Sequence, residues 1–327
     1  GNSRPYRGPG TGTEGRIGVK SRDRTRSSKS AGRMEQTAAI WTMVRDEDFF
    51  LRRWVDYYSR FVPRRHLFIL VDGEDSTLPD GLDGCQIMVL PQSRVGPGWD
   101  RRRWDFLSHF ASALTTRFDV VIGGDVDELI VVDPDLETDP VRFILNQTTE
   151  PVISPFAVEI IHRTDLEDPL NMALPILGQR RYGRINVAYC KPCIHRVPLK
   201  WSTGQHFSDH PDLCLSRALF LFHLRYVDRD MLLDRQGKRS ARIRDEMGKP
   251  VPDAAGEGWK KSTDDMDHFL ASFVRRGAPE ETDFSFEWQR RRFEKSWTFN
   301  EEQQNYQHTR LHNRRSYTIP QKFHGLF

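Results

Sequence analysis

The sequence predicts an α/β fold in which helices cover both faces of a mostly parallel sheet. Short runs of continuous apolar residues recur along the first half of the chain, and amphipathic helical segments separate them. Polar, turn-rich segments punctuate these runs. Strands that are apolar throughout are typical of parallel sheets buried on both sides, and their alternation with helices favours one large α/β domain.

The first half contains four predicted strands and two predicted helices. The strands are the apolar runs 38–44, 66–71, 86–90 and 118–122. Aromatic residues from Phe50 to Phe61 recur at helical spacing, so they predict a helix that ends before Pro63. A second helix is predicted from Trp104 to Leu114.

The second half is less regular. Strands are predicted over residues 151–161, 186–197 and 218–226. The charged stretch 228–261 predicts loops. Ser262 then begins a capping sequence, and the apolar residues after it predict a helix through Val274. We therefore interpret residues 34–260 as the α/β domain and residues 261–327 as a C-terminal helical extension.

The positive charge of the chain is concentrated at its start. The whole chain has a net charge of +3, but residues 1–33 carry nine basic and two acidic residues, so the remainder sums to −4. Nucleic-acid binding is therefore not expected. Residues 1–33 are rich in Gly, Ser and Arg, which predicts a disordered native tail or a vector-derived leader ahead of Met34. We expect a chain that starts at Met34 to fold as well as the whole.

The sequence contains no run of 18 apolar residues and no apolar signal-peptide core. We therefore expect a soluble cytoplasmic protein, with peripheral attachment at the inner face of the membrane left open. Cys190 and Cys193 have the spacing of a zinc knuckle, which His195, His206 or Cys214 could complete. No second Cys-x-x-Cys pair exists, so we interpret these thiols as core or strand residues.

An acidic motif carries the clearest chemical signal. The segment Gly123-Gly124-Asp125-Val126-Asp127-Glu128 directly follows the strongest predicted strand, where the ligand crevice of an open α/β sheet lies. Two aspartates two residues apart in extended backbone point the same way, so both carboxylates can reach one cation. Hard oxygen ligands suit Mg²⁺ or Mn²⁺, which keep positions open for diphosphate oxygens. The alternative is an acidic turn that caps the next helix.

This hypothesis assigns roles to the residues of the motif. The two glycines are expected to let the backbone turn sharply and to let a ligand approach closely. Asp127 is expected to be an exposed loop carboxylate, so its replacement should leave the fold intact.

Five segments of the chain show a common pattern. They are, in order, VRDEDFFLRRWVDYYSRF, HLFILVDGEDS, FDVVIGGDVDELIVVDP, TGQHF and LFLFHLRYVDRDM. Together these segments resemble family-2-like glycosyltransferases of the GT-A fold, which is Rossmann-like. They look closest to a bacterial group whose members begin with a short strand and an Arg-Asn/Asp-Glu loop. The resemblance covers roughly residues 38–240, and its most specific parts are Arg-Asp-Glu and Asp-Val-Asp-Glu.

The resemblance implies a nucleotide-sugar donor site at the ends of the first strands. Arg45, Asp46 and Glu47 are implied to line the nucleotide pocket, although many relatives have Asn in place of Asp46. Asp72 is implied to lie near the base and its ribose. Asp125 is implied to contact both the donor and the cation.

The same resemblance implies further ligands of the cation and the diphosphate. Asp127 is implied to bind the metal with Asp125. His223 best matches an additional metal or phosphate ligand, with His206 second; the alternatives are a core histidine for His223 and a loop histidine for His206. Arg103 is implied to face the diphosphate.

An inverting transfer needs a base that accepts the proton of the acceptor hydroxyl. The candidates that follow the metal motif are Glu159, Asp168 and Asp209. Asp168 is favoured because Leu-Glu-Asp at 166–168 resembles the base motif of related enzymes. His206, close to Asp209, is a further catalytic candidate.

The sequence is thus interpreted as a metal-dependent glycosyltransferase of the hexosyltransferase type. It would move a sugar from a nucleotide-sugar, with UDP-sugars favoured, to a glycan or glycolipid acceptor, using Mn²⁺ or Mg²⁺. The resemblance implies bacterial surface polysaccharide assembly. One alternative is a nucleotidyltransferase, which normally has a Gly-rich basic loop after its first strand. Another is an inactive carbohydrate-binding or scaffold protein, against which the intact Asp125 and Asp127 argue.

Overall fold

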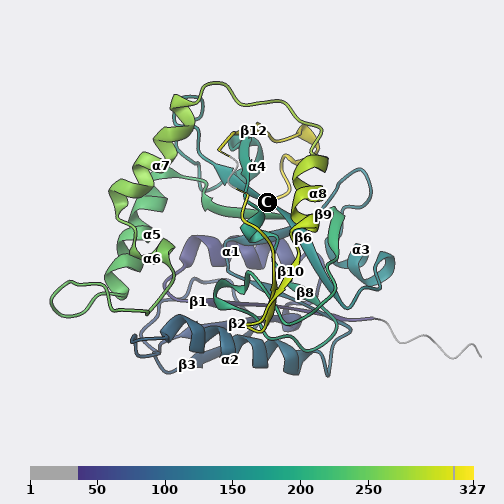
Figure 1. The fold of residues 1–327 in the computed structure, drawn as a ribbon, viewed down its shortest axis with the longest axis vertical. Coiled ribbons are helices and arrows are strands. Elements are labelled where there is room, and N and C mark those ends of the chain that lie inside the picture. The colour runs from purple at the N-terminus through teal and green to yellow at the C-terminus, as the bar shows by residue number, and fades with distance from the viewer. Residues whose placement is uncertain (1–35, 312–313) are drawn as a thin grey trace, which may run out of the picture. The chain divides into compact units, whose positions relative to one another are not determined.

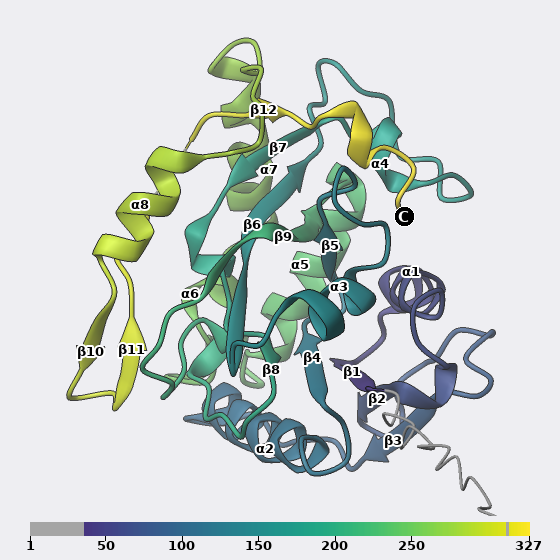
Figure 2. The same ribbon diagram turned by 90° about the vertical axis from the view of Figure 1, so that its right-hand side faces the viewer.

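A mixed sheet of ten strands with helices on both faces confirms the α/β class (Figures 1 and 2). The computed structural model describes residues 36–311 and 314–327 of the chain. The predicted tail or leader of residues 1–33 lies outside it. Within the described residues, no helix is both long and apolar enough to cross a membrane.

Four parallel strands form one half of the sheet, in the order β4-β1-β2-β3. Their bounds are Ala38–Val44 for β1, Leu67–Asp72 for β2, Gln86–Leu90 for β3 and Val120–Gly124 for β4. The four predicted strands of the first half are therefore confirmed, β1 and β3 with the predicted bounds. Parallel pairing places the carboxyl ends of β1, β2 and β4 at the same edge of the sheet.

Both faces of this half are covered by helices. Ile40 of β1 packs in the core cluster that includes α1 (Asp48–Tyr58). Its neighbour Trp41 packs in a different cluster, which includes α2 (Trp99–Leu114). Successive side chains of a strand point to opposite faces, so α1 and α2 lie on opposite sides of β1 (Figure 2).

The other half of the sheet is largely antiparallel. Its strands are β5 (Glu128–Val132), β6 (Val152–Ile161), β7 (Tyr182–Ile185), β8 (Ile194–His195) and β9 (Leu215–Tyr226). β6 pairs antiparallel with β7 and β8 and parallel with β9, which also pairs antiparallel with β5.

Two details of this half differ from the sequence-based expectation. Of the strand predicted over 186–197, only β8 (Ile194–His195) is present, and a short 3₁₀ turn at Val187–Tyr189 and irregular backbone fill most of the rest. Pro192 interrupts this stretch, because proline has no N–H for a strand ladder. β5, which begins at the last residue of the acidic motif, is a strand where none is predicted.

The helix α5 (Arg229–Arg242) lies where the sequence predicts charged loops, so that prediction is wrong. Asp228 caps its N-terminus, and its carboxylate accepts hydrogen bonds of 3.1 Å from the backbone N–H groups of Asp230 and Met231. The buried face of α5 includes Arg235 and Gln236, so an apolar stripe does not mark it in the sequence.

The helix predicted after Ser262 is confirmed as α7 (Thr263–Arg275). Ser262 and Asp265 form a capping box at its start, in which each side chain bonds the other residue's backbone N–H. The remaining helices are α3 (Pro140–Gln147), α4 (Ile176–Gln179), α6 (Glu257–Lys260) and α8 (Glu287–Lys295).

The last part of the chain contains strands as well as helices. β10 (Thr298–Asn300) and β11 (Asn305–Gln307) form a hairpin, and β12 (Tyr317–Thr318) pairs antiparallel with β7. The carbonyl of Phe327 accepts a hydrogen bond of 2.6 Å from the N–H of Ile176, and its ring packs against Tyr57 of α1. The final residues therefore complete the main core.

Candidate active site

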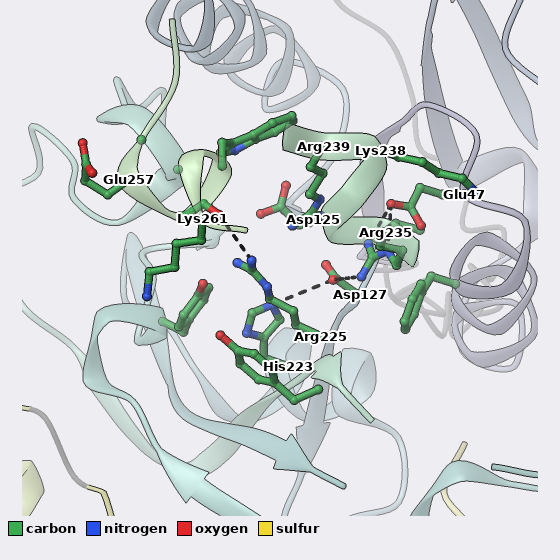
Figure 3. Close-up of a pocket in the computed structure, with 18 of the residues that line it drawn as sticks. Glu47, Asp125, Asp127, His223, Arg225, Arg235, Lys238, Arg239, Glu257 and Lys261 are labelled. Atoms are coloured by element: carbon green, nitrogen blue, oxygen red, sulfur yellow. Dashed lines mark hydrogen bonds and ion pairs between the residues drawn. The ribbon is translucent and has the colours of Figure 1, made fainter. Parts of the chain in front are cut away.

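The carboxyl ends of β1, β2 and β4 open into a cavity of about 1520 Å³. α5 contributes one wall, and residues around α6 and α7 contribute another (Figure 3). Nine of the predicted site residues line it: Arg45, Asp46, Glu47, Asp72, Arg103, Asp125, Asp127, His206 and His223. The fold thus brings the predicted donor and metal residues into one cavity.

The predicted bases Asp168 and Asp209 do not line this cavity. Both side chains are exposed, and the Asp209 carboxylate accepts a hydrogen bond of 3.0 Å from the N–H of Lys200. Glu159, the third candidate, is fully buried in β6. The three candidates follow the acidic motif in the sequence, but this order does not determine which segments of the fold lie at the cavity.

The two aspartates of the motif differ in exposure. β4 ends at Gly124 and β5 begins at Glu128, so Asp125 and Asp127 occupy a tight connection between two buried strands. The side chain of Asp125 is 35% exposed, whereas that of Asp127 is 2% exposed. The expectation that Asp127 is an exposed loop carboxylate is therefore wrong.

The glycines before the aspartates serve packing rather than a sharp turn. Neither Gly123 nor Gly124 has a positive φ, and both lie within β4. A Cβ on Gly123 would lie 2.0 Å from the indole ring of Trp41 on the neighbouring strand β1. Only glycine leaves room for this ring. Packing against Trp41, and not the expected sharp turn, therefore explains Gly123.

Asp127 is held by a cation from α5. The Nη1 of Arg235 donates a hydrogen bond of 2.8 Å to its carboxylate, and the same guanidinium bonds Glu47 at 2.7 Å (Figure 3). Burial opposes ionisation of Asp127, but the charges of Arg235 and His223 hold its pKa well below the usual value. The two acids in turn raise the pKa of Arg235 despite its burial. Arg235 therefore links the end of β1, the acidic motif and α5.

Asp125 faces a buried lysine. The Nζ of Lys191 lies 3.3 Å from Asp125 and 2.5 Å from Glu128. Burial raises the pKa of Glu128 to about 7, even though the charge of Lys191 opposes the rise. Both acids keep the pKa of Lys191 above its usual value. The ammonium group of Lys191 thus balances negative charge on Asp125 and Glu128.

His223 is oriented by a carboxylate. Its Nδ1 lies 3.0 Å from Glu159, and its Nε2 lies 3.9 Å from Asp127. Glu159 also accepts hydrogen bonds from Asn186 and Arg184. Burial raises the pKa of Glu159, but the charge of Arg184 and the bond to His223 lower it to about 2 overall. This carboxylate therefore stays ionised and fixes the imidazole with Nε2 beside Asp127.

His206 lines the cavity and contacts the ring of Tyr189, which also contacts His223. The ring centroid of Tyr189 lies 5.4 Å from that of His206 and 4.2 Å from that of His223. The Nδ1 of His206 lies 2.6 Å from the carbonyl of Ala188, so this nitrogen is the donor and Nε2 is left as an acceptor. Burial and the charge of Lys191 lower the pKa of His206 to about 3, so the ring is neutral.

Asp72 lies at the end of β2 and is buried. Its carboxylate accepts hydrogen bonds of 3.0 and 3.1 Å from the backbone N–H and hydroxyl of Ser93, and it forms an ion pair with Arg242 of α5. Trp99 donates to the same hydroxyl at 2.7 Å, and the Arg242 guanidinium lies over its ring. The predicted nucleotide residue is therefore positioned by a rigid polar network.

Arg45 and Asp46 shape the loop after β1. The guanidinium of Arg45 donates to both oxygens of Asp75 and, at 2.7 Å, to the carbonyl of Asp72. Asp46 has a φ of 53°, which asparagine and aspartate adopt more readily than other side chains. Its carboxylate accepts from the N–H of Thr77 at 3.0 Å.

Two arginines near the acidic motif differ in their partners. Arg103 bonds Asp100 at 3.1 Å and lies over the rings of Trp99 and Trp104. Within the part of the chain that the structure describes, Arg239 of α5 makes no ion pair and contacts the ring of Trp259. Arg239 therefore offers a cation to a ligand in the cavity.

The two thiols with the spacing of a zinc knuckle do not belong to a metal-binding group in the described residues. All four cysteines are free, and those at 190 and 193 are buried. The Sγ of Cys190 accepts a hydrogen bond from the N–H of Ala157, and burial raises its pKa to about 12. These contacts agree with the core interpretation.

The sequence-based reasoning missed Arg235, Arg239 and Lys191. The two arginines lie on the missed helix α5, four residues apart on one face. The cap at Asp228 could have indicated that helix. No local pattern indicates Lys191, because it stands in an irregular segment.

The donor set nevertheless fits a divalent cation. The described residues contain no group of three or more His, Cys, Asp or Glu side chains arranged to hold an ion by themselves. Mg²⁺ and related cations are commonly bound by one or two carboxylates together with substrate phosphates and water. Asp125 and Asp127 meet that need. A histidine whose other nitrogen bonds a carboxylate, as His223 does with Glu159, is typical of a metal ligand.

Comparison with known proteins identifies no family. No protein-family model matches the chain, and no curated protein matches it at a significant level.

Proposed function

We propose that this chain is a metal-dependent glycosyltransferase that uses a nucleotide-sugar donor, with a GT-A-like fold. The observation that carries the proposal is the meeting of Asp125 and Asp127 with the ends of β1 and β2 in one large cavity lined by arginines. Ligands of open α/β sheets bind at this edge. Paired carboxylates beside cationic side chains suit a nucleoside diphosphate with its divalent cation.

Asp125, Asp127 and His223 would hold Mn²⁺ or Mg²⁺. When bound, the cation neutralises the charge that develops on the departing diphosphate. Glu159 orients His223, and Arg235 positions Asp127. Glu159 and Arg235 thereby hold the imidazole of His223 and the carboxylate of Asp127 in place before the donor binds.

Side chains of α5, of α2 and of the ends of β1 and β2 would bind the donor. Arg239, which has no ionic partner among the described residues, and Arg103 supply positive charge for the diphosphate oxygens. Asp72 and the loop of Arg45, Asp46 and Glu47 line the base and ribose side.

His206 is the predicted catalytic residue that reaches the cavity. Because its ring is neutral and its Nδ1 donates to Ala188, its Nε2 accepts the hydrogen bond of an acceptor hydroxyl. This contact orients the hydroxyl toward the donor sugar. The acceptor would be a glycan or glycolipid of bacterial surface polysaccharide assembly, made on the cytoplasmic side of the membrane.

Calorimetric titration of nucleoside diphosphates tests the proposal. UDP is expected to bind in the presence of Mn²⁺ and to lose at least about tenfold in affinity in excess chelator or in Asp125→Asn. Incubation with a panel of UDP-sugars should release UDP. An affinity that does not depend on the cation would reject the metal role. Release of pyrophosphate from nucleoside triphosphates would instead support a nucleotidyltransferase.

A further inference from the structure

A second group of cations lines the same cavity. It consists of Lys261, Arg276, Arg310 and Arg314, which we call the second basic cluster. Lys261 precedes α7 and Arg276 follows it. The other two stand between β11 and β12. None of these elements contributes to the acidic motif or to the β1 and β2 ends.

The second basic cluster lacks close ion-pair partners among the described residues. In the described part of the chain, none of its four side chains makes an ion pair. Two acids also line this wall: Glu257 pairs with Lys260 at 2.6 Å, and Asp265 accepts hydrogen bonds from Ser262 in the capping box and feels the charge of Lys261, both of which lower its pKa. The four cations of the cluster therefore outnumber the two acids, Glu257 and Asp265, that line this side of the cavity.

The charges crowd one another. Partial burial and the positive charges of Arg314, Arg275 and Arg184 lower the pKa of Arg276. Its guanidinium bonds only neutral oxygens among the described residues, those of the Ser272 hydroxyl and the Arg314 carbonyl. An anion placed among these groups would relieve their repulsion.

The donor does not account for this cluster. Arg235 pairs with Asp127 and Glu47, and Arg242 pairs with Asp72, so the donor wall is largely neutralised. A divalent cation and Arg239 already balance the charge of a diphosphate there. The second basic cluster therefore remains for another ligand.

Two aromatic rings of α7 lie beside cations of this wall. Phe269 and Phe273 of α7 line the cavity, with the guanidinium of Arg184 4.7 Å from the ring centroid of Phe269 and that of Arg276 5.6 Å from that of Phe273. Aromatic rings next to cations suit a sugar ring that carries a charged substituent.

We propose that the second basic cluster binds an acceptor that carries an anionic group, a phosphate or a carboxylate, next to the sugar hydroxyl that is glycosylated. This proposal rests on the proposed function, because it requires the donor to bind at α5 and at the ends of β1 and β2. It names the acceptor class as an acidic or phosphorylated glycan rather than a neutral one.

Binding of simple anionic sugars to the full chain tests this assignment. With the donor wall saturated by UDP and Mn²⁺, the protein is titrated with glucose 1-phosphate, glucuronate or glucose at low ionic strength. We expect one or both charged sugars to bind at least about tenfold more tightly than glucose, since charge-assisted hydrogen bonds are the strong ones. Added salt should weaken this preference, because exposed charges are screened.

Paired variants separate the cluster from general charge. Arg276→Gln and Arg310→Gln should each weaken binding of the charged sugar several-fold without changing UDP affinity. Arg275→Gln removes the same charge from an exposed neighbour that does not line the cavity, so it should have little effect.

The outcomes distinguish the sources of the anion. Preference for glucose 1-phosphate indicates a phosphorylated acceptor, and preference for glucuronate indicates an acidic glycan. Equal binding of all three sugars, no binding of any, or identical effects of Arg275→Gln and Arg276→Gln would overturn the proposal. Failure of UDP itself to bind would reject the proposed function separately, and the anionic sugars could still be titrated alone.

Discussion

The carboxylate of Asp127 has two separable roles, one in the fold and one in the proposed site. Asp127→Asn keeps the volume but removes the charge that neutralises Arg235. Since Glu47 still pairs with that guanidinium, we expect the free energy of unfolding to fall by only about 1–3 kcal/mol. UDP affinity in Mn²⁺ should fall at least about tenfold. Urea denaturation and calorimetry measure the two effects.

Asp125→Asn provides the comparison. Because the Asp125 side chain is 35% exposed and lies 3.3 Å from Lys191, its replacement should cost less stability and lose a similar amount of UDP affinity. If folded Asp127→Asn binds UDP as well as the unmodified chain, Asp127 has a structural role alone.

Glu159 is a positioning residue, because it acts through His223. Glu159→Gln should leave Nε2 of His223 less well fixed beside Asp127, and outer-shell changes of this kind weaken metal affinity about 10- to 100-fold. Mn²⁺ affinity in the presence of UDP, measured by electron paramagnetic resonance, reports the change. Glu167→Gln alters another buried carboxylate outside the cavity and is the matched control. Equal Mn²⁺ affinities of the two variants would contradict the positioning role.

Two glycines, one in a strand and one in a helix, make opposite predictions. A Cβ at Gly237 of α5 would meet Thr263 at an ordinary contact of 3.9 Å, so Gly237→Ala should stabilise the protein by about 0.5–1 kcal/mol. Gly123→Ala in β4 would drive a methyl group into the Trp41 ring and should cost about 1–3 kcal/mol or more. Thermal unfolding compares them. A stable Gly123→Ala variant would show that Trp41 can move.

Elements with regular apolar patterns could be predicted, and those with polar buried faces could not. β1 and β3 match their predicted bounds, and α7 follows from its capping sequence. α5 was missed because Arg235 and Gln236 lie on its buried side. Likewise, the acidic motif can be recognised from adjacent residues alone. Its contact with Arg235 joins residues 108 positions apart, so no local pattern predicts it.

For the molecule as a whole, buried neutral histidines predict that the free energy of unfolding falls at acidic pH, which we call the acid limb of stability. Burial lowers the pKa of His195 and of His308 to about 4 from a usual 6.5. The unfolded chain therefore binds more protons between these values. The contribution is fully present above pH 6.5 and is lost as pH falls toward 4, by up to about 3 kcal/mol for each ring.

His308→Phe isolates one of these rings. The His308 ring centroid lies 4.1 Å from that of Phe293, and its buried Nε2 has no partner in the described residues, so phenylalanine should pack in its place. Urea denaturation from pH 7.5 to 4.5 should show a shallower loss of stability in the variant. Coincident curves would mean that His308 does not contribute to the acid limb.

The position of Phe327 has a consequence for how the chain is made. β12 completes the edge beside β7, and Phe327 closes the core against Tyr57 and the N–H of Ile176. A ribosome still encloses the newest residues, so these contacts cannot form until translation has passed residue 327. At ordinary elongation rates, the nascent chain keeps this aromatic surface uncovered for on the order of tens of seconds.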